Sequence, residues 1–285
     1  MKSLIVLAIA FATFSMGQEE TIPKFPESDA VLTSMKKATA FHRSNLSIAG
    51  GYASTWSRDL KQSKTESSTG NALISIQPHG TTTVGLAVLR AHAITGDPIF
   101  LQGAEEAANA LAWSQLSSGG WGSEFDFKLG AGRKLHFRRD LFAGDVELGI
   151  RNAHSTLDDN KTQSAIRFLM EFPEPPEALA FAWDGLLAAQ ASNGGWPQRF
   201  SGPADQTLPV EKASYPEEWP RTFPRVDYAT YFTINDNNLE HVLDILLAAH
   251  RLENAKSNRL LDAAKRLGDF LILAQMPEPK PAWAQ

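Results

Sequence analysis

The stretches "AWSQLSSGGW" at residues 112–121 and "LAAQASNGGW" at residues 187–196 are two copies of one pattern. Each reads as the end of a helix that closes on glutamine, followed by a glycine-rich turn and a tryptophan. A third copy, "LILAQMPEPKPAW" at residues 271–283, has prolines in place of the glycines. The three glutamines are Gln115, Gln190 and Gln275. A pattern that returns after 75 and then 85 residues predicts repeated structural units.

Two helical patterns precede each glutamine, because apolar residues recur three and four positions apart. The expected helix pairs are 81–95 with 100–115, 161–172 with 178–190, and 238–251 with 257–275. Self-similar helical hairpins predict a solenoid or a closed ring. Because every hairpin ends in the same pattern, we favour an all-α fold of the α/α-toroid type, in which one helix of each hairpin faces the centre. An open right-handed solenoid is the alternative.

The chain begins with the features of a secretory signal peptide. Lys2 precedes an apolar run at residues 4–14, which is too short to span a bilayer. We therefore predict cleavage of residues 1–17 and a secreted or periplasmic protein, not bound to a membrane after cleavage. An N-terminal segment at 18–50 and a toroid domain at 51–285 follow.

Composition narrows the class of partner. The formal net charge of −5 argues against a general binder of polyanions such as nucleic acid. The chain has no cysteine, so an exported form would depend on burial and not on disulfides for stability. We expect a monomer.

In a toroid, the loops that precede equivalent inner helices converge on one rim. These loops are "QPHGTT" at 77–82, "STLDDN" at 155–160 and "FTINDN" at 232–237. Asn160 and Asn237 could cap the helices that follow, each with Gln or Glu three residues on, as in a capping box. Asp159 and Asp236 would then fall one position earlier, where the helix does not need them.

Two carboxylates at matched, non-capping positions on one rim repel each other unless a cation lies between them. Hard oxygen ligands with no cysteine and no histidine at ligand spacing favour calcium over zinc. We predict a calcium site formed by Asp158, Asp159 and Asp236. A purely structural role at the helix N-termini is the alternative, because acids are also favourable there.

Four motifs in order resemble the pectic acid lyases of polysaccharide lyase family ten. They are "STLDDNKTQSAIRFLM" at 155–170, "NGGWPQRF" at 193–200, "YFTINDNNLEHVLDIL" at 231–246 and "EPKPAWAQ" at 278–285. The resemblance implies an α/α-toroid pectate lyase that uses calcium to cleave polygalacturonate by β-elimination. By motif, the acidic loops would bind calcium and substrate through Asp158 or Asp159 and through Asp236.

β-Elimination removes the C5 proton beside the C6 carboxylate of a uronate, and a cation that neutralises this carboxylate makes the proton more acidic. The family uses an arginine as the base, in a segment that follows the "PKPAW" motif. We therefore expect the base to lie beyond Gln285, and this chain to bind substrate weakly and turn it over slowly or not at all. A further difference is Asn160, which stands where the family usually carries another acid.

Basic residues offer contacts for substrate carboxylates. The segment "FKLGAGRKLHFRR" at 127–139 alternates around a glycine turn, which predicts a small β-hairpin insert carrying Lys134 and Arg138. Arg199 and Arg225 are further candidates. The insert could equally be a solvated hairpin, and the repeated tryptophans are more often core residues than platforms for sugar rings.

The sequence is also compatible with two other functions. A glycoside hydrolase on the same fold could use Asp159 and Asp236 as acid and base. A carbohydrate-binding protein could have kept the toroid without the chemistry.

Overall fold

The computed structural model describes residues 28–128, 134–218, 221–222, 231–252 and 258–283. Helices dominate these residues, and the strands are two or three residues long. The helices are α1 (Ser28–Asn45), α2 (Thr81–Thr95), α3 (Pro98–Ser114), α4 (Arg138–Phe142), α5 (Lys161–Met170), α6 (Glu177–Ala188), α7 (Asn238–Leu252) and α8 (Arg259–Ala274). None of the described helices is long and apolar enough to cross a membrane.

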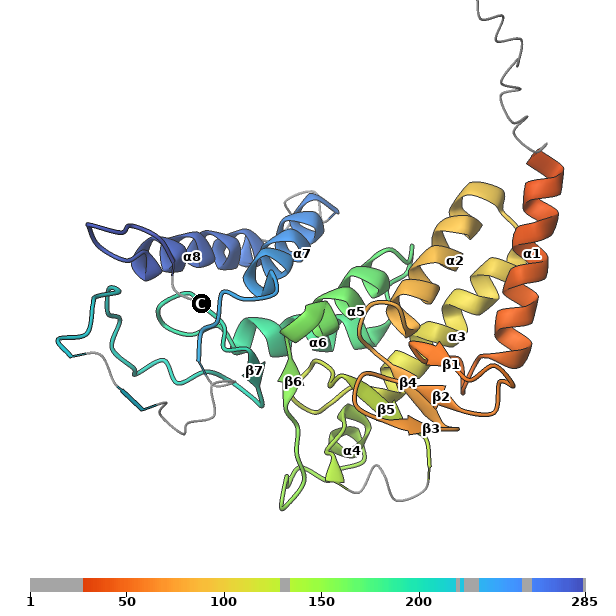
Figure 1. Ribbon diagram of the computed structural model, residues 1–285, viewed down its shortest axis with the longest axis horizontal. Coiled ribbons are helices and arrows are strands. Elements are labelled where there is room, and N and C mark those ends of the chain that lie inside the picture. The colour runs from red at the N-terminus through yellow and green to blue at the C-terminus, as the bar shows by residue number, and fades with distance from the viewer. Residues whose placement is uncertain (1–27, 129–133, 219–220, 223–230, 253–257, 284–285) are drawn as a thin grey trace, which may run out of the picture.

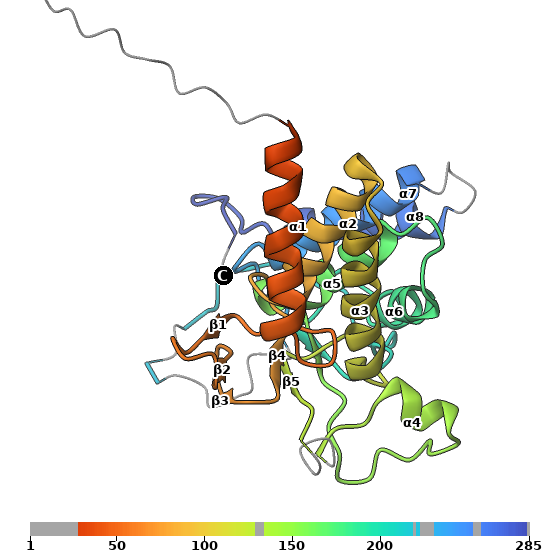
Figure 2. The same cartoon turned by 90° about the vertical axis from the view of Figure 1, so that its right-hand side faces the viewer.

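Three helical hairpins form an arc. The pairs α2 with α3, α5 with α6, and α7 with α8 each pack together, and α5 also packs between α2 and α7. Figure 1 shows the arc running from α1 to α3 at one end to α7 and α8 at the other. Figure 2 looks along it, with the first hairpin in front and α1 covering α3. The predicted all-α fold of the α/α-toroid type is confirmed, with α2, α5 and α7 as the inner helices.

The short strands lie beside the ends of the hairpins. The strands β1 (Thr55–Trp56), β2 (Ser63–Lys64) and β3 (Thr69–Gly70) form an antiparallel sheet in that order. The strand β4 (Leu73–Ser75) pairs with β5 (Glu124–Asp126), and β6 (Ser155–Thr156) pairs with β7 (Arg199–Phe200). The last pair matters most for the site, because β6 leads directly into the acidic loop.

Small hairpin strands therefore occur, but at residues 55–70. The described parts of the 127–139 segment pair elsewhere: Leu135 bridges Asn152, Phe137 bridges Leu116, and α4 begins at Arg138. Residues 129–133 of that segment lie outside the described residues.

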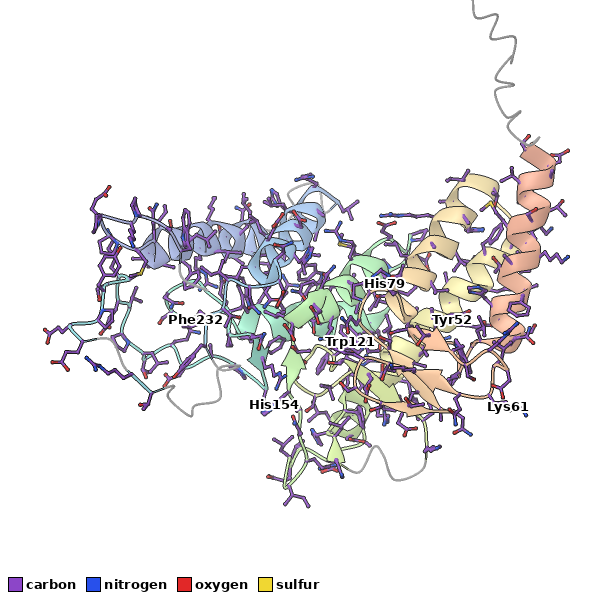
Figure 3. The ribbon with its side chains drawn as sticks, in the orientation of Figure 1. Tyr52, Lys61, His79, Trp121, His154 and Phe232 are labelled. Atoms are coloured by element: carbon purple, nitrogen blue, oxygen red, sulfur yellow. The ribbon has the colours of Figure 1, made fainter. Side chains whose placement is uncertain are left out.

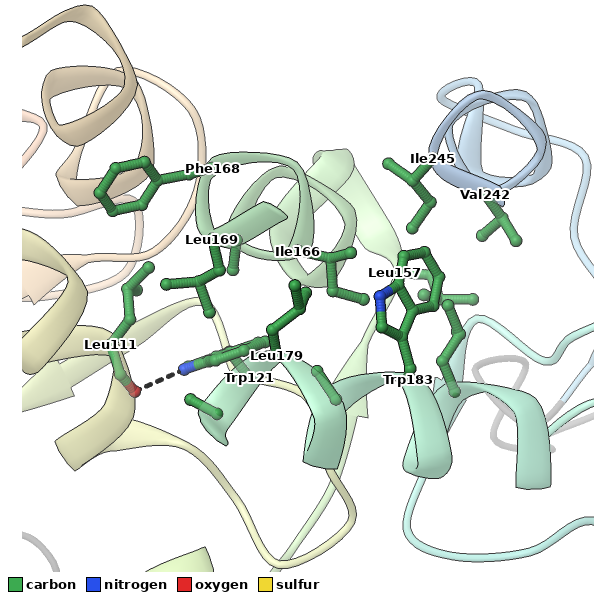
Figure 4. Packing of buried hydrophobic residues seen from close by; sticks show 14 of the residues in the cluster. Leu111, Trp121, Leu157, Ile166, Phe168, Leu169, Leu179, Trp183, Val242 and Ile245 are labelled. Carbon is green, nitrogen blue, oxygen red and sulfur yellow. Dashed lines mark hydrogen bonds between the residues drawn. The ribbon is translucent and has the colours of Figure 1, made fainter. Parts of the chain in front are cut away.

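The glutamine and tryptophan of each repeat join one hairpin to the next. The Gln115 side-chain amide donates to the Gly119 carbonyl at 2.7 Å and to the Ala178 carbonyl of α6 at 2.9 Å. The Trp121 indole donates to the Leu111 carbonyl at 2.8 Å and is fully buried among the core residues shown in Figure 4. The buried glutamine amide nitrogen and the indole N–H are both paired in this way, whereas Gln115 Oε1 has no partner within the described residues.

The second junction repeats the first. Gln190 donates to the Gly194 carbonyl at 2.8 Å and to the Ala263 carbonyl of α8 at 3.0 Å, while the Trp196 indole donates to the Leu186 carbonyl at 2.7 Å. Gly194 has φ +90°, and a Cβ there would collide with the backbone of Arg266. Only glycine combines this conformation with so close an approach.

The third junction starts in the same way, but within the described residues it contacts the loop of Tyr215 and no further hairpin. Gln275 donates to the Pro281 carbonyl at 3.3 Å, and the Trp283 indole donates to the Leu271 carbonyl at 2.7 Å. Trp283 is half exposed, whereas Trp121 and Trp196 are buried.

Candidate functional site

The two acidic rim loops have the same unusual backbone. Asp159 and Asn160 have φ angles of 48° and 61°, and Asp236 and Asn237 have φ angles of 49° and 55°. Left-handed backbone costs about 1–2 kcal/mol per residue, and aspartate and asparagine tolerate it better than most residues. The matched pairs show that the loops are structurally equivalent, as their sequences predict.

The predicted capping box at Asn160 is wrong. Asn160 makes no side-chain cap hydrogen bond to α5. Gln163, its expected partner, is buried and donates to the Leu157 carbonyl at 2.8 Å and the Asn238 carbonyl at 3.1 Å. Asn160 therefore fits its position through its left-handed backbone and not through a cap. The corresponding box at Asn237 and Glu240 stays a prediction.

The loops bring together the three predicted carboxylates. Asp158, Asp159 and Asp236 each place one carboxylate oxygen within 4.8 Å of the other two. Gln77, from the first rim loop, donates to Asp159 Oδ2 at 3.1 Å. All three rim loops thus meet at one point, and the predicted convergence is confirmed. We call Asp158, Asp159 and Asp236 the acidic cluster.

The carboxylates differ in how firmly the protein holds them. Asp158 accepts a hydrogen bond from the Gln198 amide at 2.9 Å, and its backbone N–H donates to Thr156 at 3.2 Å. Asp236 is exposed and accepts a bond from its neighbour Asn235 at 2.7 Å. Within the described residues, no lysine, arginine or histidine forms an ion pair with Asp236. One side of the cluster is fixed, and the other side carries an unpaired charge.

Lys161 lies against the fixed side, a contact that the sequence did not predict. Its side chain is 2% exposed, and its ammonium is 3.2 Å from Asp159 Oδ2, 3.5 Å from Asp158 Oδ2 and 3.4 Å from Glu66 Oε2. A lysine in the first turn of a helix is unfavourable next to the positive end of the helix dipole. That unfavourable position, two residues after a pair of aspartates, was the signal in the sequence.

Buried oxygens near the cluster lack donors. Gln198 is 2% exposed, and while its nitrogen bonds Asp158, its Oε1 has no hydrogen-bond partner within the described residues. Among the residues that the structure describes, Gln163 Oε1 on α5, Asn238 Oδ1 on α7 and Gln115 Oε1 at the first junction are buried acceptors without partners as well. Native proteins seldom leave buried polar atoms unpaired. A surplus of hard oxygens over donors suits a cation such as calcium, so these residues fit the predicted calcium site.

The structure describes Arg199, a predicted substrate-binding residue, on the strand that pairs next to the acidic loop. It lies on β7, paired with Thr156 of β6, and it follows Gln198, which contacts Asp158. Its side chain is exposed. Arg225 lies outside the described residues.

Lys134 and Arg138 form no hydrogen bond or ion pair with the acidic cluster within the described residues. Lys134 is exposed, and the Arg138 guanidinium lies 5.1 Å from the Phe142 ring centre. The neighbouring Arg139 lies over the Phe137 ring at 3.8 Å, and burial lowers its pKa. The basic residues at the start of α4 thus contribute to aromatic packing.

Aromatic and imidazole groups add little to the cluster itself. Trp121 and Trp196 are core residues, as the structural interpretation predicted. Figure 3 labels His154 just before β6 and His79 just before α2, and both are exposed.

No protein-family model matches this chain, and no curated protein matches it in sequence. Among solved structures, it is similar to a mutant family 10 polysaccharide lyase from Cellvibrio cellulosa in complex with trigalacturonic acid, with a TM-score of 0.47 and 15% identity over 83% of this chain and 68% of that one. It is also similar to cellobiose 2-epimerase from Spirochaeta thermophila, with a TM-score of 0.45 and 16% identity over 85% of this chain and 54% of that one. Likenesses this distant assign no activity.

Proposed function

We propose that this protein is a secreted, calcium-dependent pectate lyase that acts on polygalacturonate by β-elimination. One observation carries the proposal: Asp158, Asp159 and Asp236 lie close together, on two rim loops that share the same left-handed backbone. Like charges held this close are costly without a cation. The sequence motifs that resemble family ten supply the reaction and the substrate class.

Each side chain has a distinct task in this proposal. The acidic cluster binds the cation, Gln198 orients Asp158, and Gln77 orients Asp159. Bound calcium would neutralise a uronate carboxylate and make the adjacent C5 proton more acidic. We assign Arg199, an exposed arginine next in sequence to Gln198, to a further carboxylate of the polygalacturonate.

The spacing of these carboxylates fits an inverting glycoside hydrolase poorly, although it is close to the about 5–5.5 Å between the two carboxyl groups of a retaining one. Inverting hydrolysis needs carboxyl groups about 6.5–9.5 Å apart to leave room for water. Asp159 and Asp236 bring oxygens within 4.8 Å of each other. Asp159 Oδ2 also accepts hydrogen bonds from both Lys161 and Gln77. These donors suit an ionised carboxylate that binds a cation better than a carboxylic acid that must donate a proton.

The test is an assay of the purified chain on polygalacturonate, with calcium or with a chelator, following unsaturated uronate products by ultraviolet absorbance. We expect chelator-sensitive product formation, or chelator-sensitive binding if the base lies outside this chain. Asp236→Asn should abolish both, whereas Asp244→Asn should not, because Asp244 is an exposed acid on α7 outside the cluster.

The outcomes separate the candidate functions. Products with a reducing end but no unsaturation would identify a hydrolase. Binding of polygalacturonate that persists in chelator would identify a carbohydrate-binding protein without calcium chemistry. Calcium-dependent binding that Asp236→Asn leaves intact would contradict the assignment of the cluster.

A further inference from the structure

Lys161 is an ion-pairing residue at the centre of the rim site. An ammonium has three hydrogens to donate, and Lys161 Nζ has three carboxylate neighbours, from Glu66, Asp158 and Asp159. The side chain is 2% exposed, and the turn between β2 and β3 that carries Glu66 lies beside it. This places a fixed positive charge inside the site.

The ammonium of Lys161 changes the net charge that a cation or an anionic sugar chain meets at this site. Glu66 and the three aspartates of the acidic cluster carry four negative charges, against one positive charge on Lys161. A divalent cation would leave the group with a single excess negative charge. Without the ammonium, two would remain, and a polyanionic sugar chain would meet stronger repulsion.

We propose that Lys161 sets the specificity of this site by opposing two affinities: it weakens binding of the divalent cation and strengthens binding of an anionic sugar chain to the cation-loaded site. Its ammonium competes with the cation for Asp158 and Asp159. Once the cation is bound, the same ammonium offsets part of the carboxylate charge that faces the substrate. The inference rests on the proposed function in that the cluster must bind a divalent cation.

Lys161→Met tests the inference, because methionine has a similar length and no charge. Calcium binding to the purified chain is measured by titration calorimetry, and trigalacturonate binding is measured at saturating calcium. We expect calcium to bind about tenfold more tightly and trigalacturonate about tenfold more weakly than to the wild type. A purely structural lysine would weaken both, so equal losses would overturn the inference.

Glu66→Gln provides the opposite change in charge at a residue outside the acidic cluster. Glu66 is half exposed and contacts the other side of Lys161. Removing its negative charge should weaken calcium binding and strengthen trigalacturonate binding, each a few-fold. Lys64→Met, at an exposed residue of β2, makes the same charge change as Lys161→Met and should alter neither affinity.

The wild-type result separates this inference from the proposed function. If calcium binds only to Lys161→Met, the competition is supported and calcium dependence of the natural protein is contradicted. If calcium binds the wild type and neither variant moves the two affinities in opposite directions, the inference fails and the calcium site stands. If calcium binds none of the variants, both are overturned.

Discussion

The junctions between hairpins and the rim loops both repeat along the chain, but the repeated residues differ in what they contact. At the junctions, Gln115 and Gln190 place both amide hydrogens on carbonyls of the protein, and their tryptophans are buried. On the rim, Asp236 is exposed and has no cationic partner within the described residues. The junction glutamine amides are explained by contacts within the fold, whereas for the exposed Asp236 we propose a ligand.

The largest effect is expected at the buried junctions. Trp196→Ala removes a fully buried indole and its bond to Leu186, and should lower the free energy of unfolding by about 3–5 kcal/mol. Trp283→Ala should cost well under half as much, because Trp283 is half exposed. Urea denaturation of both variants checks this. Equal losses of unfolding free energy in the two variants would show that Trp283 is buried in solution.

Substitution of the junction glutamines should also destabilise the second junction more than the third, with smaller losses of unfolding free energy than for the tryptophans. Gln190→Leu leaves the carbonyls of Gly194 and Ala263 without this donor, at a cost of about 1–3 kcal/mol. Gln275→Leu should cost less, since its bond to Pro281 is exposed and weaker in geometry. Urea denaturation gives the loss of unfolding free energy for each variant. The difference between the two losses measures how much a junction is stabilised by the hairpin that follows it.

On the rim, stability should respond to only one of the two equivalent aspartates. In chelator, Asp159→Asn removes an ion-pair partner of the buried Lys161 and should cost about 1–2 kcal/mol. Asp236→Asn should change the free energy of unfolding by less than about 0.5 kcal/mol, because it breaks no ion pair and asparagine tolerates the left-handed backbone. A large loss from Asp236→Asn would favour the structural interpretation of the rim acids.

Asp97 is an acid with an ordinary structural role, and its effect on stability should depend on pH. Its side chain caps α3 through Ile99, and hydrogen bonds from Lys36 and then Ile99 lower its pKa. Because the pKa is lower in the folded state, its contribution is present above the unfolded-state pKa and is lost as pH falls through the folded value. The melting temperatures of wild type and Asp97→Ala should therefore differ slightly at neutral pH and converge in acid. A difference that persists in acid would mean that the alanine acts through the helix and not through the charge.

Much of the fold could be predicted from local patterns. The helix α2 was predicted at its observed bounds, and the other hairpin helices were predicted within two residues or so at each end. Apolar periodicity carries this information because the residues that it buries lie on the same helix face. The segment at 127–139 was harder, since its partners, Leu116 and Asn152, come from other parts of the chain.

For the site, the repeat alone located the acidic cluster, because equivalent loops of equivalent hairpins must meet on one rim. The sequence therefore determined which carboxylates come together. Tertiary structure decided the rest. Gln198 bonds Asp158 and Glu66 pairs with Lys161, both from segments far from the cluster in sequence, and Lys161 is a buried charge and not a surface lysine. Burial and ion pairing depend on all the neighbours at once, and no local pattern contains them.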